Sequence, residues 1–250
     1  MQLKSLLVAL VLIFGTVTAF FLGGYHALVP IRFSAGLLCV SAVCLWAASR
    51  VRTKKLVTLA GVTIAVATVD EYLHVSTGVY EYYDRGVPSP ISVFGWSLLM
   101  VFILMIATML SKFLPWKNRR KRPGTIPALV ILILLPVSAG MQGYLPILRS
   151  PVILLYAVMC MLSLFYAYTQ PLGWTISLMI SGMIVGGAME FVGSLDGLWS
   201  FHFAESLPLF MIVVWALRTW AVHASCFLLD VDFAEEKIRA SVMKNVASTR

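Results

Sequence analysis

The chain has 250 residues, of which 60% are hydrophobic and 12% are charged, and its mean hydropathy is +0.91. A soluble domain of this length usually carries about 25% charged residues. Half of that charge, together with several long apolar runs, excludes an ordinary soluble globular protein and predicts an all-α polytopic membrane protein. The net charge of +8 comes from short basic clusters between apolar runs, and none of them lies on a soluble face with interleaved aromatic residues, so no nucleic-acid partner is predicted.

The apolar runs predict eight membrane-spanning helices. Their expected positions are residues 5–23, 33–49, 56–75, 91–111, 125–143, 152–168, 173–193 and 207–229. The first run, from Leu6 to Leu22, is long for a signal peptide and lacks a small-x-small cleavage site, so it is interpreted as the first span. Prolines fall near the predicted ends, where a missing backbone N–H is least costly.

Basic residues lie mostly on one side of the predicted membrane. Fifteen of the 19 Lys and Arg residues fall on that side and three on the other, while Arg218 lies within the last span. Because basic loops are retained in the cytoplasm, both termini are expected to be cytoplasmic, in a multi-pass protein of the plasma membrane. The acidic residues at or near the outer face are Asp70, Glu71, Glu81, Asp84, Glu190, Asp196 and Glu205.

A shift of 119 positions aligns the two halves of the sequence without a gap. Glu71 falls on Glu190 and Trp96 on Trp215, and both residue types are scarce in this chain. A repeat every four spans preserves direction, so the halves are expected to be related by an axis along the membrane normal. The predicted organisation is a first four-helix repeat (1–115), a basic cytoplasmic linker (116–124), a second four-helix repeat (125–229) and a cytoplasmic tail (230–250).

The aligned glutamates are the candidate catalytic residues. Glu71 and Glu190 are expected at the outer end of the third helix of each half, where dehydration of a carboxylate is costly unless it becomes neutral. One hypothesis is a pocket between the halves, with paired carboxylates under an aromatic lid. The candidate substrate-binding residues are Tyr80, Tyr82, Trp199, Phe201, Trp96 and Trp215. The alternative is structural: each Glu accepts hydrogen bonds from the loop that follows it, and the aromatic residues anchor the membrane interface.

A metal site is a further alternative. Glu71 and His74 have the i, i+3 spacing used in di-metal carboxylate bundles. The residues that could complete such a site are Glu190, His202 and Glu205. Gly193 stands where the repeat would require a second histidine, so the motif is not duplicated and no metal is predicted.

Arg218 lies near the middle of the last predicted span. An arginine inside a membrane usually faces a partner or water. The alternative is a salt bridge or a snorkelling position directed toward the cytoplasm.

One stretch of the chain resembles membrane proteins of carotenoid biosynthesis: E-Y-L-H-V-S-T-G-V-Y-E-Y-Y, which continues to V-P-S-P-I-S-V-F-G-W. The stretch is similar to the hydratases that act on bacterioruberin-type and gamma-carotene precursors. Members of that family carry a Glu, then Thr-Gly, aromatic residues and a Val-Pro before a helix. The resemblance covers about 30 residues and maps onto Glu71, Thr77, Gly78, Tyr80, Tyr82, Val87 and Pro88.

The resemblance implies acid-catalysed addition of water to a terminal isoprenoid double bond. A protonated Glu would supply the proton, aromatic faces would stabilise the tertiary cation, and water would complete the reaction. In this scheme Glu71 and Glu190 take the acid and base roles. The implied partners are membrane lipid and an apolar isoprenoid substrate. No cofactor is expected, because the sequence has no P-loop, no GxGxxG after a strand and no nucleophile elbow.

Two other functions stay open. A non-catalytic accessory or assembly subunit of a membrane complex would explain the lack of a strong catalytic motif. A transporter would explain repeated halves that carry acids, although these acids are expected near one face rather than at the midplane. The space between the halves distinguishes the hypotheses: a long apolar tunnel ending at the glutamates favours an enzyme, and a filled interface favours a subunit.

Overall fold

The computed structural model describes residues 3–28, 30–113, 129–136, 150–202 and 209–234. Within these ranges, seven helices are long and apolar enough to cross a membrane, as expected of a multi-pass membrane protein. They are α1 (Leu3–Leu22), α2 (Ile31–Ala48), α3 (Thr53–Ser76), α4 (Pro90–Phe113), α6 (Ser150–Thr169), α7 (Leu172–Leu195) and α8 (Leu209–Leu228).

Seven of the eight predicted spans coincide with these helices to within three residues at either end. Of the other predicted span, 125–143, only residues 129–136 are described, and they are helical. The predicted linker, 116–124, lies outside the described residues.

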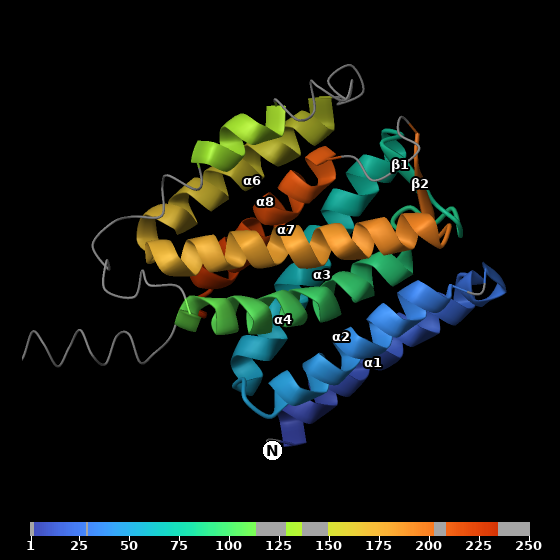
Figure 1. The fold of residues 1–250 in the computed structure, drawn as a ribbon, viewed down its shortest axis with the longest axis horizontal. Helices are drawn as coiled ribbons and strands as arrows, with labels where there is room; N and C mark the ends of the chain where they lie inside the picture. The colour runs from blue at the N-terminus through green and yellow to red at the C-terminus, as the bar shows by residue number, and fades with distance from the viewer. Residues whose placement is uncertain (1–2, 29, 114–128, 137–149, 203–208, 235–250) are drawn as a thin grey trace, which may run out of the picture.

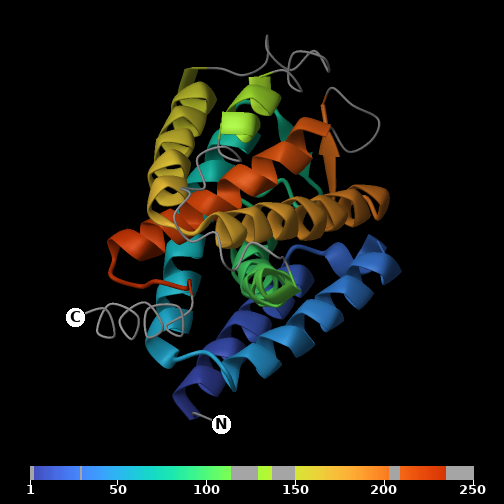
Figure 2. The same ribbon diagram turned by 60° about the vertical axis from the view of Figure 1, so that its left-hand side comes forward.

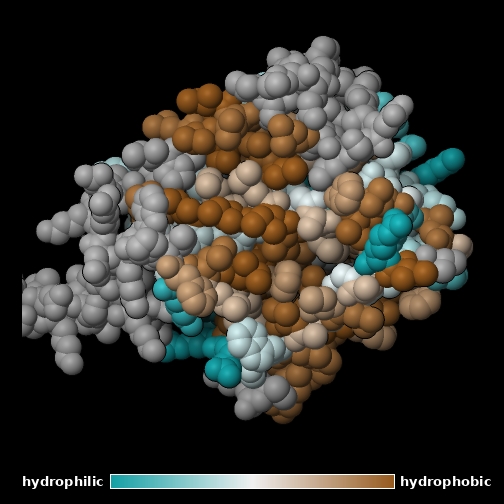
Figure 3. Space-filling view, viewed as in Figure 1, coloured by the Kyte–Doolittle hydropathy of each residue, from teal (hydrophilic) through white to brown (hydrophobic). Residues whose placement is uncertain are grey.

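Helices α4, α7 and α8 form the centre of the bundle. Helix α7 packs on both α4 and α8, while α3 packs on α4 and α6 packs on α8. Helices α1 and α2 lie together beyond α4, on the side away from α6 (Figures 1 and 2). The face in Figure 3 shows a broad hydrophobic surface over the helices, with hydrophilic side chains toward its two ends, as a lipid-facing belt requires.

Helices α3 and α7 end in the same way. Gly78 and Gly197 follow them with φ angles of +76° and +72°, which a residue with a Cβ rarely adopts. The next amide, of Val79 or Leu198, donates across the turn to the carbonyl oxygen of His74 or Gly193, at 2.9 Å in both cases. This is the Schellman motif, which gives hydrogen-bond donors to the free carbonyls at the end of a helix and turns the chain sharply.

The turns lead into two short strands that join the ends of α3 and α7. Strand β1 (Tyr80–Tyr82) pairs antiparallel with β2 (Trp199–Phe201), with Glu81 opposite Ser200. The two strands lie at one end of the bundle in Figure 1. Because the strands are paired, the C-terminal ends of α3 and α7 lie at the same end of the molecule.

Corresponding elements recur at a constant interval. Helix α3 begins at Thr53 and α7 at Leu172, 119 positions later, and the same interval separates the starts of α2 and α6, of β1 and β2, and of α4 and α8. Trp96 and Trp215, also 119 positions apart, contact each other with ring centroids separated by 4.8 Å.

Candidate functional site

A buried arginine links three helices at the centre of the bundle. Arg218 of α8 is fully buried, and its Nη2 donates to Oδ2 of Asp70 on α3 at 2.5 Å. Its Nη1 donates to Oε1 of Glu190 on α7 at 3.4 Å. Arg218 therefore forms a salt bridge inside the protein, and the snorkelling alternative is wrong, because the guanidinium is buried with two carboxylate partners. Such pairing is what makes a buried charge tolerable.

A histidine and a tyrosine extend this cluster. Nδ1 of His74 donates to the carbonyl oxygen of Asp70 at 2.7 Å and lies 3.3 Å from the Asp70 carboxylate. The other ring nitrogen, Nε2, lies 2.6 Å from the hydroxyl of Tyr156 on α6. The histidine ring also stacks on Tyr80, with centroids 5.7 Å apart. Asp70 therefore connects Arg218 to a chain of polar groups that reaches α6.

Glu71 is held by the strand that follows its helix. Its Oε2 accepts hydrogen bonds from the hydroxyls of Tyr80 and Tyr82, both at 2.7 Å. Burial, with the neighbouring charge of Glu71, raises the pKa of both tyrosines well above its usual range, so they stay protonated and donate. This is the contact that the structural alternative predicts for Glu71.

Glu190 is held differently, although it is the aligned residue. Both of its hydrogen bonds arrive on Oε1, from Arg218 and from Nε1 of Trp215 at 3.0 Å. Among the described residues no donor reaches Oε2. Both partners of Glu190 come from α8, not from the loop after α7, so the structural alternative does not describe this glutamate.

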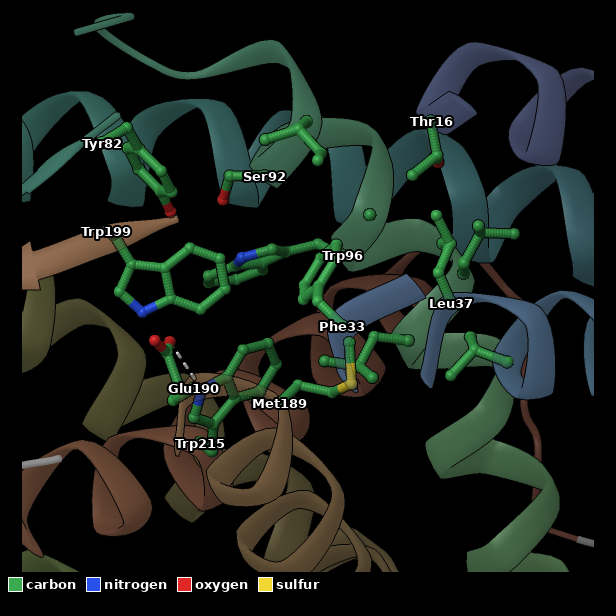
Figure 4. Close-up of a pocket in the computed structure, with 15 residues that line it drawn as sticks. Thr16, Phe33, Leu37, Tyr82, Ser92, Trp96, Met189, Glu190, Trp199 and Trp215 are labelled. Carbon is green, nitrogen blue, oxygen red and sulfur yellow. Dashed lines mark hydrogen bonds between the residues drawn. The ribbon is translucent and has the colours of Figure 1, made fainter. Parts of the chain in front are cut away.

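The carboxyl group of Glu190 borders a cavity of about 60 Å³ between α1, α2, α4 and α7 (Figure 4). At about 10–15 Å³ per water molecule, this space holds a few waters or the last few carbon atoms of an apolar chain. The lining residues are Thr16, Phe33, Leu37, Val40, Tyr82, Ile91, Ser92, Gly95, Trp96, Leu98, Leu99, Met189, Glu190, Trp199 and Trp215.

The cavity is much smaller than a tunnel for a whole isoprenoid chain. Trp96 and Trp215 pack against each other beside it and fill the middle of the bundle. The space between the predicted halves therefore matches neither expectation completely: among the described residues it is mostly filled, and a small aromatic cavity is open beside Glu190.

Five of the eight predicted site residues border this cavity: Glu190, Tyr82, Trp96, Trp199 and Trp215. The other three do not. Glu71 contacts the cavity only through Tyr82, whose hydroxyl it binds. Tyr80 lies against His74, and Phe201 packs edge-on to Tyr80 with centroids 5.8 Å apart.

The sequence interpretation missed Asp70 as the main partner of Arg218. The signal was available, because a lone arginine in an apolar span requires a carboxylate at similar depth and few acids are present. It also missed Leu37, Leu99 and Met189, which appear in the sequence as ordinary apolar residues and become wall residues only through helix packing.

The alternative metal set does not come together. Among the described residues no group of three or more His, Cys, Asp or Glu side chains could hold a metal ion. Of the members of that set, His202 is exposed and Glu205 lies outside the described residues.

Gly193 shapes the cavity wall. A Cβ at this position would lie 2.0 Å from the ring of Trp199, so the indole packs directly on the helix backbone. At the aligned position of α3, the ring of His74 stacks on Tyr80 instead. The absence of a side chain at Gly193 therefore accommodates the larger indole.

We expect Gly193→Ala to push Trp199 out of the wall, because the added methyl overlaps a rigid ring. Overpacking of this kind costs about 1–3 kcal/mol. Thermal unfolding in detergent would show the loss. The matched control is Gly61→Ala in α3, where a Cβ meets nothing within 4 Å and stability should be unchanged or slightly higher. Equal stability of both variants would contradict the tight contact.

No family model, curated protein or solved structure matches this chain.

Proposed function

We propose that the chain is a membrane-embedded enzyme that adds water to a terminal double bond of an isoprenoid or carotenoid chain, with Glu190 as the acid. The observation that carries this proposal is the position of Glu190. Its Oε2 has no donor among the described residues, and the side chain borders a cavity walled by aromatic rings and sized for the end of an apolar chain.

We also propose that the chain consists of two parallel four-helix repeats, related by a two-fold axis along the membrane normal. A two-fold axis exchanges equivalent residues, and the strand register has this form: Tyr80 pairs with Phe201 and Tyr82 with Trp199, around Glu81 and Ser200. The contact between Trp96 and Trp215 gives a second point close to such an axis. The matching helix starts and the two glycine turns support the same relation.

The first step is protonation. Oε1 of Glu190 accepts from Arg218 and Trp215, so a proton is best held on Oε2. Arg218 stays paired with Asp70, so a neutral Glu190 leaves no isolated buried charge. The O–H bond of Glu190 breaks, a C–H bond forms at the less substituted alkene carbon, and the tertiary carbon becomes the cation. The faces of aromatic rings in the wall stabilise that charge.

The second step is addition of water. An oxygen lone pair of water forms the C–O bond, and the water must lose one proton. Tyr82 borders the cavity and donates to Glu71, so its oxygen can accept the proton while its own proton passes to Glu71. The product is a tertiary alcohol, and the cycle closes when a proton returns from Glu71 to Glu190.

The test is expression in a host that accumulates carotenoids with terminal double bonds, followed by pigment analysis with and without the chain. We expect pigments heavier by one water molecule per reacting end. If the pigments are unchanged and the chain co-purifies with a constant membrane partner, the accessory-subunit function replaces this one. The filled, ion-paired region around Arg218 and Asp70 is the observation that favours that alternative.

The proposal also places both termini in the cytoplasm of a plasma-membrane protein. Single cysteines introduced into a cysteine-free background between Lys117 and Arg122 should react with an impermeant reagent only after the membrane is opened. A cysteine introduced at Glu81, the exposed residue of β1, serves as the outer-face control and should react in intact cells. Labelling of the basic segment from outside would contradict this orientation.

A further inference from the structure

The two contacting tryptophans, Trp96 and Trp215, have a cation beside them. The guanidinium carbon of Arg218 lies 4.5 Å from the ring centre of Trp96 and 5.2 Å from that of Trp215. At these distances the ring faces attract a positive charge. The same two rings also border the cavity, which Arg218 does not line.

The cavity lies where the repeat would place the counterpart of the Arg218 cluster. The residue 119 positions before Arg218 is Leu99, and the residue 119 positions after Asp70 is Met189. Both of these apolar residues line the cavity. On one side of the tryptophan pair, the guanidinium of Arg218 fills the space. On the other side the equivalent residue is Leu99, which is shorter than an arginine, so the equivalent space stays open as the cavity.

We propose that the cavity is a binding site for a trialkylated cationic centre at the end of an apolar chain. The centre fills the place that a guanidinium holds in the other half. Two sources share this chemistry: a tertiary alkylammonium ligand, and the tertiary carbocation of the reaction proposed above. The second source depends on the proposed function, whereas the first does not.

The walls fit a positive charge surrounded by alkyl groups. Three indoles and Tyr82 supply aromatic faces, and Glu190 supplies a carboxyl oxygen without a donor among the described residues. Figure 4 shows the Glu190 carboxyl group directed toward Trp199, so the acid and the rings face a common space. None of the described residues that line the cavity is a Lys or an Arg. Aromatic cages of this kind recognise alkylated ammonium groups in other proteins.

The test compares two probes of the same shape, protonated N,N-dimethylhexylamine and neutral 2-methyloctane. Binding to the purified full chain in detergent is followed by tryptophan fluorescence. We expect the amine to bind about tenfold more tightly than the hydrocarbon, from cation–π attraction and the Glu190 carboxylate. Glu190→Gln should remove most of that preference and leave hydrocarbon binding unchanged. The control is Glu81→Gln, an exposed carboxylate on β1, which should change neither.

A second variant fills the cavity from within. Leu99→Arg places a guanidinium where the ligand cation is expected and should abolish amine binding. Equal affinity for the two probes in the parent, or equal losses for both in Glu190→Gln, would overturn the inference.

The outcomes also separate the two proposals. Selective amine binding without any new pigment in the expression test leaves the cation site standing and removes the hydration reaction. New pigment without amine selectivity leaves the reaction standing and removes the cation site.

Discussion

Arg218→Leu is expected to be among the most destabilising single substitutions in this chain. It removes the charge that neutralises Asp70, whose carboxylate is fully buried and lies in contact with the Arg218 guanidinium. Breaking a buried ion pair by removing one partner costs about 3–5 kcal/mol, because the other charge is left without compensation. Thermal unfolding in detergent and the yield of folded protein from membranes measure the loss.

The double variant Asp70→Met, Arg218→Leu tests the cause. It installs the residues found 119 positions away, Met189 and Leu99, and removes both charges together. Replacing a buried pair by apolar residues is often close to neutral, so most of the stability lost in Arg218→Leu should return. A double variant as unstable as the single one would show that Asp70 is not what makes Arg218 necessary.

The sequence predicted the helices well because each span depends only on its own apolar run. Seven spans matched to within three residues, and the glycines at 78 and 197 mark turns that are local in the chain. The 119-residue interval is also visible in the order of the residues, and the starts of four pairs of elements follow it.

The candidate site was harder to predict because the two aligned glutamates are not equivalent. Glu71 is satisfied by tyrosines from its own loop, and Glu190 by an arginine and an indole from another helix. That difference arises at positions outside the aligned Glu and aromatic residues. The main one is the position that holds Leu99 in the first half and Arg218 in the second. An alignment of similar residues emphasises what the halves share, whereas the cavity arises where they differ.

Because Glu71 and Glu190 have different partners, their glutamine variants are expected to have different effects. Glu190→Gln keeps the size of the side chain and an acceptor for Trp215 and Arg218, but it cannot deliver a proton at neutral pH. General acid catalysis contributes about 10²–10⁴-fold, so hydration should fall by at least about 100-fold in the pigment assay. Folding should be affected less, since an amide oxygen can still accept the bonds that Oε1 accepts.

Glu71→Gln should lower both the turnover and the stability of the protein, because Glu71 binds the hydroxyl of Tyr82. The amide oxygen can take the place of Oε2 and accept both tyrosine hydroxyls, but it carries no charge, so both hydrogen bonds become weaker. We expect slower product formation, from loss of the proton acceptor, together with a stability loss of about 1–3 kcal/mol. Parallel measurement of turnover and unfolding distinguishes the roles: a catalytic Glu190 loses activity while the protein stays folded. Full hydration activity in Glu190→Gln would remove it as the acid, because no amide can replace a proton donor there.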